Sequence, residues 1–105
     1  MEFRFVYITA RSQAEARKIG TALVEERLAA CVNIIPGMRS IYRWESKIEE
    51  AEETVLIAKT SKARIPALME RVRALHSYDC PCVVSFAVDD GNPDYLNWLD
   101  AQTTP

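Results

Sequence analysis

The sequence predicts an α+β fold of one domain, residues 1–105, in which four strands and two helices are followed by a short terminal helix. Three observations support this prediction. Four segments are rich in β-branched and aromatic residues, as strands are. Two segments between them carry apolar residues at helical spacing. Of the 105 residues, 49% are hydrophobic, which suits a single globular core.

The first strand is predicted at Phe3–Thr9, and its mostly apolar sequence places it inside the sheet. Ser12 and Glu15 have the spacing of a capping box at the start of a helix. This helix is expected to end near Leu28 and to bury one stripe of side chains. The members of that stripe are Ala16, Ile19, Leu23 and Val24.

The two longest strands are predicted at about Cys31–Trp44 and Ile48–Thr60. The pair Pro36–Gly37 interrupts the first of them at a place that suits a β-bulge, because proline cannot donate to a ladder and glycine tolerates unusual dihedral angles. Beyond this interruption the residues alternate with a period of two. One side carries Met38, Ser40, Tyr42 and Trp44, and the other carries Arg39, Ile41 and Arg43.

The hairpin made by these strands is expected to be longer than the domain that carries it. Each arm of about 13 residues spans roughly 43 Å, whereas a compact domain of this size is about 34 Å across. A two-stranded ribbon is marginally stable in water, and Ile41, Tyr42, Trp44 and Ile48 lie near its tip. We therefore expect other copies of the same chain to cover the ribbon.

The second half of the chain supplies the remaining elements. Ser61 can cap a second helix, and Pro66 lies in its opening turns, where a missing N–H costs less. A loop at His76–Pro81 leads to a fourth strand at Cys82–Val88, and Pro93 can start the terminal helix. The apolar faces of the two helices comprise Ile65, Leu68, Met69, Val72 and Leu75 in the first, and Tyr95, Trp98 and Leu99 in the second.

The resulting order, β-α-β-β-α-β, is that of the ferredoxin-like fold. Two right-handed crossovers joined by a hairpin give an antiparallel sheet with both helices on one face. Because many unrelated functions use this fold, it does not by itself select one.

Composition narrows the classes of function. A net charge of −2 does not favour nonspecific nucleic-acid binding, and no apolar run reaches the roughly 20 residues of a membrane helix. Without a leader pattern at the start and with an odd count of three cysteines, a cytoplasmic protein is expected. An acidic group in the hairpin is expected to be a solvated face. Its members are Glu45, Glu49, Glu50, Glu52 and Glu53.

Several motifs occur in an order and spacing that is specific to one family. They are EERLAACVNIIPG at Glu25–Gly37, SIYRWESK at Ser40–Lys47, the pair Lys59–Thr60, HSYDCP at His76–Pro81 and YLNWL at Tyr95–Leu99. On these motifs the chain is identified as a member of the CutA divalent cation tolerance family. The resemblance covers nearly the whole chain.

The resemblance implies a homotrimer held by intersubunit strand pairing, with an architecture similar to that of the PII signalling proteins. It also implies a role in tolerance to copper and other divalent metals, signalling-type rather than catalytic. The chain departs from the family pattern at four places: Ser77 replaces a proline, Cys82 a glutamate and Ser46 a glycine, while Ile8 stands where some members have a cysteine. Of the copper ligands proposed for the family, only His76 is present.

The candidate metal ligands are His76, Cys80 and Cys82. An imidazole and two thiols suit copper, and residues i and i+2 of a strand share a face. The alternatives are a histidine at a helix C-terminus or hydrogen-bonded beside Tyr78, and cysteines that serve packing. Cys31 is a further candidate, although a small buried side chain is its ordinary role.

A second set of residues is expected at a pocket or a subunit interface. The aromatic members have polar handles that suit both locations, and Lys59 can receive an anion. These residues are Tyr42, Trp44, Lys59, Tyr78, Tyr95 and Trp98, with Cys31 beside them.

Three other classes of function are weighed against the metal-tolerance hypothesis. Acylphosphatases share the predicted fold, but they need a glycine in the phosphate loop, and ITARSQAE has Arg11 without one. RNA-recognition modules also share it, but they need a basic surface. A scaffolding trimer that binds a partner protein or a small metabolite at intersubunit clefts stays open as the alternative.

Overall fold

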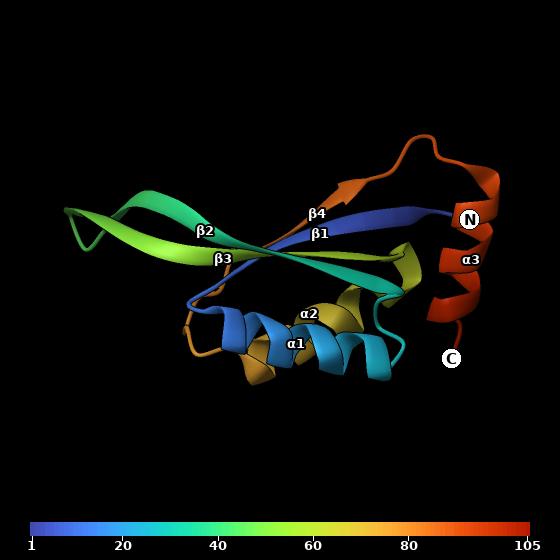
Figure 1. Ribbon diagram of the computed structural model, residues 1–105, viewed down its shortest axis with the longest axis horizontal. Helices are drawn as coiled ribbons and strands as arrows, with labels where there is room; N and C mark the ends of the chain where they lie inside the picture. Colours follow the sequence, from blue (N-terminus) through green and yellow to red (C-terminus); the bar gives the residue numbers. More distant parts are fainter.

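The computed structural model describes residues 1–105 as a four-stranded sheet with two helices on one face and a third helix at one end (Figure 1). The strand order is β2-β3-β1-β4, and every neighbouring pair is antiparallel, which confirms the ferredoxin-like prediction. The elements are β1 (Phe3–Ala10), α1 (Gln13–Glu25), β2 (Cys31–Trp44), β3 (Lys47–Ser61), a 3₁₀ turn (Lys62–Arg64), α2 (Ile65–Leu75), β4 (Val83–Ala87) and α3 (Pro93–Thr103).

The core lies between the sheet and the two helices α1 and α2. Alternate residues of the central strands β1 and β3 point into it, and the predicted helical stripes meet them. Val24 and Met69, expected in those stripes, are instead exposed, because they lie at the rim of the helix faces. The core comprises Val6, Ile8, Ala10, Ala16, Ile19, Leu23, Leu28, Ala29, Leu56, Ala58, Leu68 and Val72.

Two helix starts differ in detail from the sequence prediction. Ser12 caps α1 as expected, its Oγ accepting from the Glu15 N–H at 3.1 Å, but the Glu15 carboxylate accepts from Arg11 N–H rather than from Ser12. Ser61 makes no capping hydrogen bond. The reason is that β3 continues to Ser61, which pairs with Phe3 in the sheet, so α2 begins only after the 3₁₀ turn.

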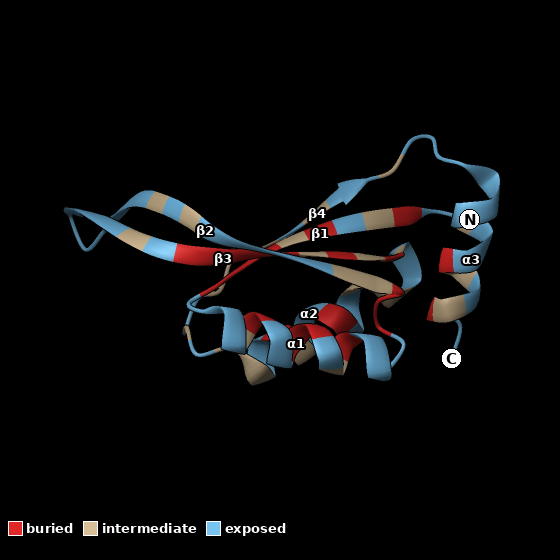
Figure 2. Cartoon of the chain, viewed as in Figure 1, coloured by how far each residue is buried: buried red, intermediate tan, exposed pale blue.

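The hairpin of β2 and β3 projects beyond the rest of the sheet, as predicted. Strand β1 pairs with β3 only over residues 54–61, whereas Met38–Trp44 pairs with Lys47–Glu53 and has no third strand beside it. We call this unsupported part the ribbon (Figures 1 and 2). It extends the molecule to 45 Å along its longest axis. On one face of the ribbon Ile41 is 71% exposed and Ile48 is 63% exposed.

Residues with positive φ shape both ends of the ribbon. At its base Pro36 and Gly37 oppose the single residue Thr54, which is the predicted β-bulge, and Gly37 has φ of +80°. At its tip Glu45 and Ser46, with φ of 49° and 67°, form a two-residue turn. Positive φ at both positions is the requirement of a type I′ turn, for which glycine suits the second position.

Exchanging glycine at these two turns is expected to change stability in opposite directions. Ser46→Gly removes the steric cost of the left-handed backbone and should raise the free energy of unfolding by about 0.5 to 1 kcal/mol. Gly37→Ala introduces that cost and should lower it by about 1 kcal/mol. Urea denaturation at fixed protein concentration measures both. A stabilised Gly37→Ala variant would show that the bulge does not need a positive φ.

Candidate functional site

A cavity of about 340 Å³ lies at the base of the ribbon. Tyr42 and Trp44 occupy alternate positions of β2, and the register places them on the same ribbon face as Glu53 of β3. The loop between α2 and β4 closes the other side. The lining residues are Thr9, Tyr42, Trp44, Glu53, Tyr78, Asp79, Cys80 and Cys82. The cavity therefore unites both ribbon strands, the end of β1 and the loop at residues 78–82.

Glu53 and Tyr78 join the ribbon to this loop. The Tyr78 hydroxyl donates to Glu53 Oε2 at 2.8 Å, and Glu53 is only 8% exposed. Burial, together with the neighbouring Glu53 carboxylate, raises the pKa of the Tyr78 hydroxyl to about 12. The tyrosine therefore keeps its proton at physiological pH and holds a carboxylate at the cavity wall. The expectation that Glu53 belongs to a solvated acidic face is wrong, because the sheet and the loop cover it.

The two cysteines of the cavity lie in the loop before β4. Strand β4 begins at Val83 rather than at Cys82, so the argument from strand alternation does not apply to them. Both nevertheless line the cavity, with Cys80 exposed and Cys82 half-buried. Burial and the negative charge of Glu53 raise the pKa of the Cys82 thiol, while a hydrogen bond with Thr9 acts in the opposite direction.

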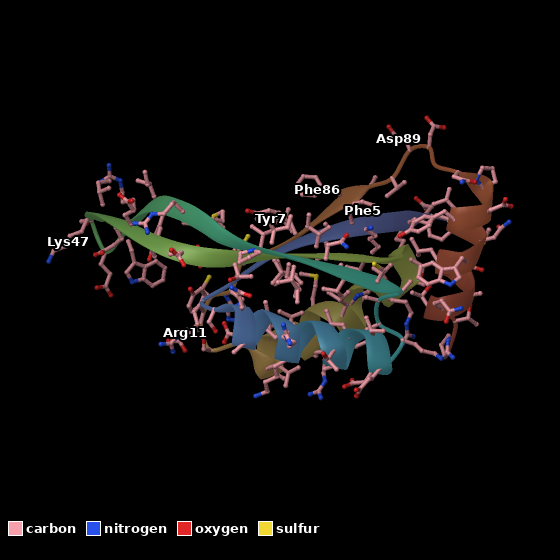
Figure 3. The ribbon with its side chains drawn as sticks, viewed as in Figure 1. Phe5, Tyr7, Arg11, Lys47, Phe86 and Asp89 are labelled. Carbon is pink, nitrogen blue, oxygen red and sulfur yellow. The ribbon has the colours of Figure 1, made fainter.

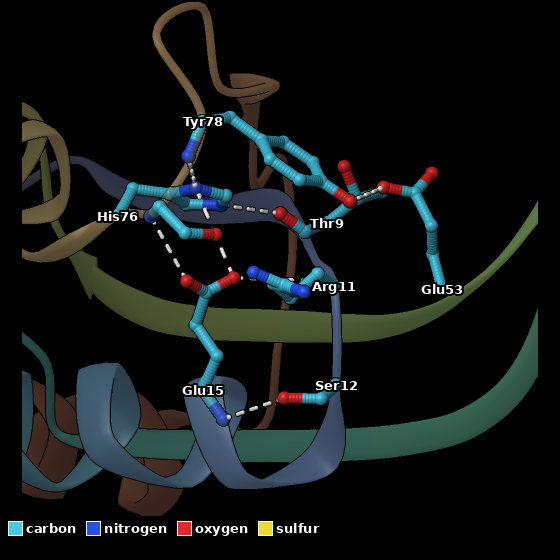
Figure 4. Close-up of polar contacts among 8 residues, drawn as sticks. Thr9, Arg11, Ser12, Glu15, Glu53, His76 and Tyr78 are labelled. Carbon is cyan, nitrogen blue, oxygen red and sulfur yellow. Dashed lines mark hydrogen bonds and ion pairs between the residues drawn. The ribbon is translucent and has the colours of Figure 1, made fainter.

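His76 is buried behind the cavity and holds the loop in place (Figure 4). Its side chain is 0% exposed. Nδ1 accepts from the Tyr78 N–H at 3.0 Å, so the proton is on Nε2, which donates to the Thr9 carbonyl oxygen at 2.7 Å. Among the roles considered for His76, a hydrogen-bond partner beside Tyr78 is the one observed. Both ring nitrogens are occupied by main-chain groups, and His76 does not line the cavity.

Glu15 fixes the start of the same loop. Its carboxylate accepts from the Arg11 N–H at 3.0 Å and from the Ser77 N–H at 2.9 Å. Burial raises the pKa of this carboxyl, but the hydrogen bonds from Ser77 and Arg11, aided by a smaller electrostatic contribution from His76, outweigh that effect. The net result is a pKa below its ordinary value. Glu15 thus links the N-terminus of α1 to the loop that follows α2.

The remaining predicted site residues form a separate group beside α3. The Lys59 ammonium lies 5.5 Å from the ring centroid of Phe5 and 5.7 Å from that of Tyr95. Tyr95 in turn packs on Trp98, with ring centroids 5.7 Å apart. Cys31 is the register partner of Lys59 on β2. Lys59, Tyr95, Trp98 and Cys31 do not line the cavity, so the sequence set divides between two places in the fold.

Three lining residues were missed by the sequence analysis: Thr9, Glu53 and Asp79. A signal existed for Glu53. Its position opposite Met38 follows from the hairpin register once the bulge is counted, and this places it on the ribbon face of Tyr42 and Trp44. No local pattern marks Thr9, which reaches the cavity only because β1 ends there.

The predicted ligand set of His76, Cys80 and Cys82 is not assembled within the chain. The structure holds no group of three or more histidine, cysteine or carboxylate side chains placed to bind a metal ion. The two thiols share the cavity, whereas the imidazole is engaged elsewhere. Metal binding by this set is thus a matter for proposal and experiment.

The sequence matches the family described as “CutA1 divalent ion tolerance protein” over residues 4–102. The chain belongs to the CutA family. It is 51% identical over 98 residues to the divalent-cation tolerance protein CutA of Thermus thermophilus, covering 93% of this chain and 95% of that protein. It is 44% identical over 97 residues to the mouse protein CutA, covering 92% of this chain and 55% of the mouse protein.

Solved CutA structures have the same fold. The structure of the Cut A1 protein from Thermus thermophilus superimposes with a TM-score of 0.95 at 49% identity, covering 97% of this chain and 99% of that one. The periplasmic CutA from Archaeoglobus fulgidus gives 0.95 at 40% identity, covering 97% and 99%. Family membership therefore establishes a divalent-cation tolerance protein. None of the helices has the length and apolar character needed to cross a membrane.

Removing the Glu15 carboxylate is expected to destabilise the protein in a pH-dependent way. Because folding lowers the pKa from 4.5, Glu15 contributes stability above that pH, and the contribution is lost as the pH falls through the folded value. Glu15→Gln should lower the free energy of unfolding by about 1 to 2 kcal/mol at pH 7. The difference from wild type should shrink at about pH 3, as urea denaturation can measure. A difference independent of pH would contradict this account.

Proposed function

We propose that this CutA-family chain acts as a non-catalytic homotrimer that binds copper weakly and responds to metal ions in the manner of a signalling protein. The cytoplasm is the proposed location, since all three cysteines are free thiols. Relatives in other compartments are known by name, such as the chloroplastic CutA of Arabidopsis thaliana. The observation that carries the proposal is an apolar sheet face joined to an unsupported ribbon.

The open face, by which we mean the sheet face opposite α1 and α2, supports assembly. Figure 3 shows Phe5, Tyr7 and Phe86 on this side of the sheet. Phe86 is 58% exposed and its neighbour Val84 is 48% exposed, while Phe5 and Phe86 are register partners across β1 and β4. A contiguous apolar surface of this kind is characteristic of protein interfaces. Another copy of the chain would bury it.

The edges of the sheet favour a closed ring over a two-fold dimer. One edge is the long strand β2 with its ribbon, and the other is the short strand β4. Pairing of unlike edges between neighbours is a heterologous contact, which closes into a ring when the rotation allows it. A trimer built in this way would support each ribbon and leave no long exposed edge.

Charging the open face is expected to break the assembly. Phe86→Glu should shift the molar mass in solution from that of three chains to that of one, because a carboxylate cannot be buried there without a partner. Met69→Glu is the matched control, since Met69 is exposed on α2 on the other side of the sheet. Light scattering after size exclusion measures the mass. A single-chain mass for the wild type would overturn the trimer.

Copper binding is proposed at the cavity through the thiols of Cys80 and Cys82. Both line the same wall, and thiols prefer soft ions such as Cu(I). Only two thiols are available there in one chain, so we expect weak binding, with the remaining positions filled by solvent or by a neighbouring subunit. His76 contributes by holding the loop rather than as a ligand.

The double variant Cys80→Ser, Cys82→Ser is expected to lose copper binding. Titration of the metal-free wild-type protein with Cu(I) should saturate in the micromolar range, and the double variant should show no saturable signal. Cys31→Ser serves as the matched control, because Cys31 lies in β2 away from the cavity. Equal loss in the control, or no saturation in the wild type, would count against the proposal.

A further inference from the structure

The charge of the cavity lining selects positively charged ligands. Two of the eight lining residues are acidic, Glu53 and Asp79, and none is lysine, arginine or histidine. Glu53 is the more important of the two because it is mostly buried, where a charge is poorly screened by water. Its Oε2 accepts from Tyr78, while Oε1 accepts no hydrogen bond from the chain. An anion or a neutral polar ligand would leave this charge uncompensated.

Three aromatic side chains surround this charge. Tyr42 and Trp44 come from β2, and Tyr78 comes from the opposing loop. Tyr42 is 44% exposed and Trp44 is 54% exposed, so much of each ring is available to a ligand. The faces of tyrosine and tryptophan rings attract cations, and this attraction increases when the cation is desolvated. Aromatic rings around a carboxylate are therefore suited to a cation with an apolar surface.

An organic cation fits this arrangement better than a metal ion does. The chain provides no group of three metal-ligating side chains, so a strongly hydrated ion would have to exchange its water for rings that cannot coordinate it. A methylated ammonium ion is weakly hydrated and needs only a counter-charge and apolar contact. The raised pKa of the Cys82 thiol also keeps that group neutral, as an apolar wall requires.

We infer that the part of the cavity formed by Tyr42, Trp44, Glu53 and Tyr78 binds a small organic cation of the methylated ammonium class. The ammonium group would lie between the rings and close to Glu53 Oε1. The volume of about 340 Å³ is at the small end of ligand sites, which limits the ligand to a small molecule. The inference uses the same cavity as the copper proposal but different side chains, so each can fail without the other.

The test is titration of the protein, in its native assembly, with tetramethylammonium chloride followed by NMR. Trp44 and Trp98 are the two tryptophans, and each gives one indole N–H signal. The Trp44 signal should shift in a saturable way, whereas the Trp98 signal, beside Tyr95 in α3, should not. The neutral molecule tert-butanol has a similar size and should cause no saturable shift. Sodium chloride at the same concentration controls for ionic strength.

Three variants assign the binding to individual side chains. Glu53→Gln keeps an acceptor for the Tyr78 hydroxyl but removes the charge, and it should weaken binding at least about tenfold. Glu52→Gln removes the same charge one residue away on the opposite, exposed ribbon face, and it should leave binding unchanged within about twofold. Trp44→Leu removes a ring from an exposed ribbon position and should weaken binding about tenfold, as followed by calorimetry.

The possible results separate the explanations. Equal binding of tert-butanol, or equal loss in Glu53→Gln and Glu52→Gln, would overturn the inference, because the first indicates an apolar site and the second a general charge effect. No saturable shift of the Trp44 signal would also overturn it. The Cys80→Ser, Cys82→Ser variant should retain tetramethylammonium binding while losing copper. Loss of tetramethylammonium binding in that variant would contradict the separation of the two sites.

Discussion

The ribbon of β2 and β3 imposes the main constraint on this structure. Beyond residue 54 of β3 no third strand supports it, and yet apolar side chains lie on both of its faces, Ile41 and Ile48 on one and Tyr42 and Trp44 on the other. Two strands alone bury too little surface to offset the entropy of ordering them. The ribbon therefore needs cover, which links its length to the apolar open face and to the proposed trimer.

The same geometry explains where the cavity lies. The bulge at Pro36 and Gly37 resets the register so that Glu53 and Trp44 share a ribbon face. The ribbon forms one wall, and the loop after α2 forms the other. Loops of this kind are usually mobile, but here His76 binds the end of β1 and Glu15 binds Ser77. These main-chain contacts hold the loop against the ribbon without occupying the cavity.

Within the cavity, two chemistries lie side by side. The thiols of Cys80 and Cys82 offer soft donor atoms, whereas the rings of Tyr42 and Trp44 stand near the carboxylate of Glu53. The charge of Glu53 helps to keep the Cys82 thiol protonated, so the two halves influence each other electrostatically. A ligand that neutralised Glu53 would remove one cause of the raised thiol pKa. This coupling provides a physical route by which one ligand could alter the affinity for another.

The sequence by itself determined the element order, the bulge, the overhanging ribbon and the capping by Ser12, because each depends on neighbours in the chain or on a simple period. It also grouped Tyr42 with Trp44. Only the tertiary structure decided that Glu53 is buried, that His76 holds the loop rather than facing a ligand, and that Lys59 belongs with Tyr95 at the other end. Such outcomes depend on packing between segments far apart in the sequence, where desolvation and long-range hydrogen bonds outweigh local preference.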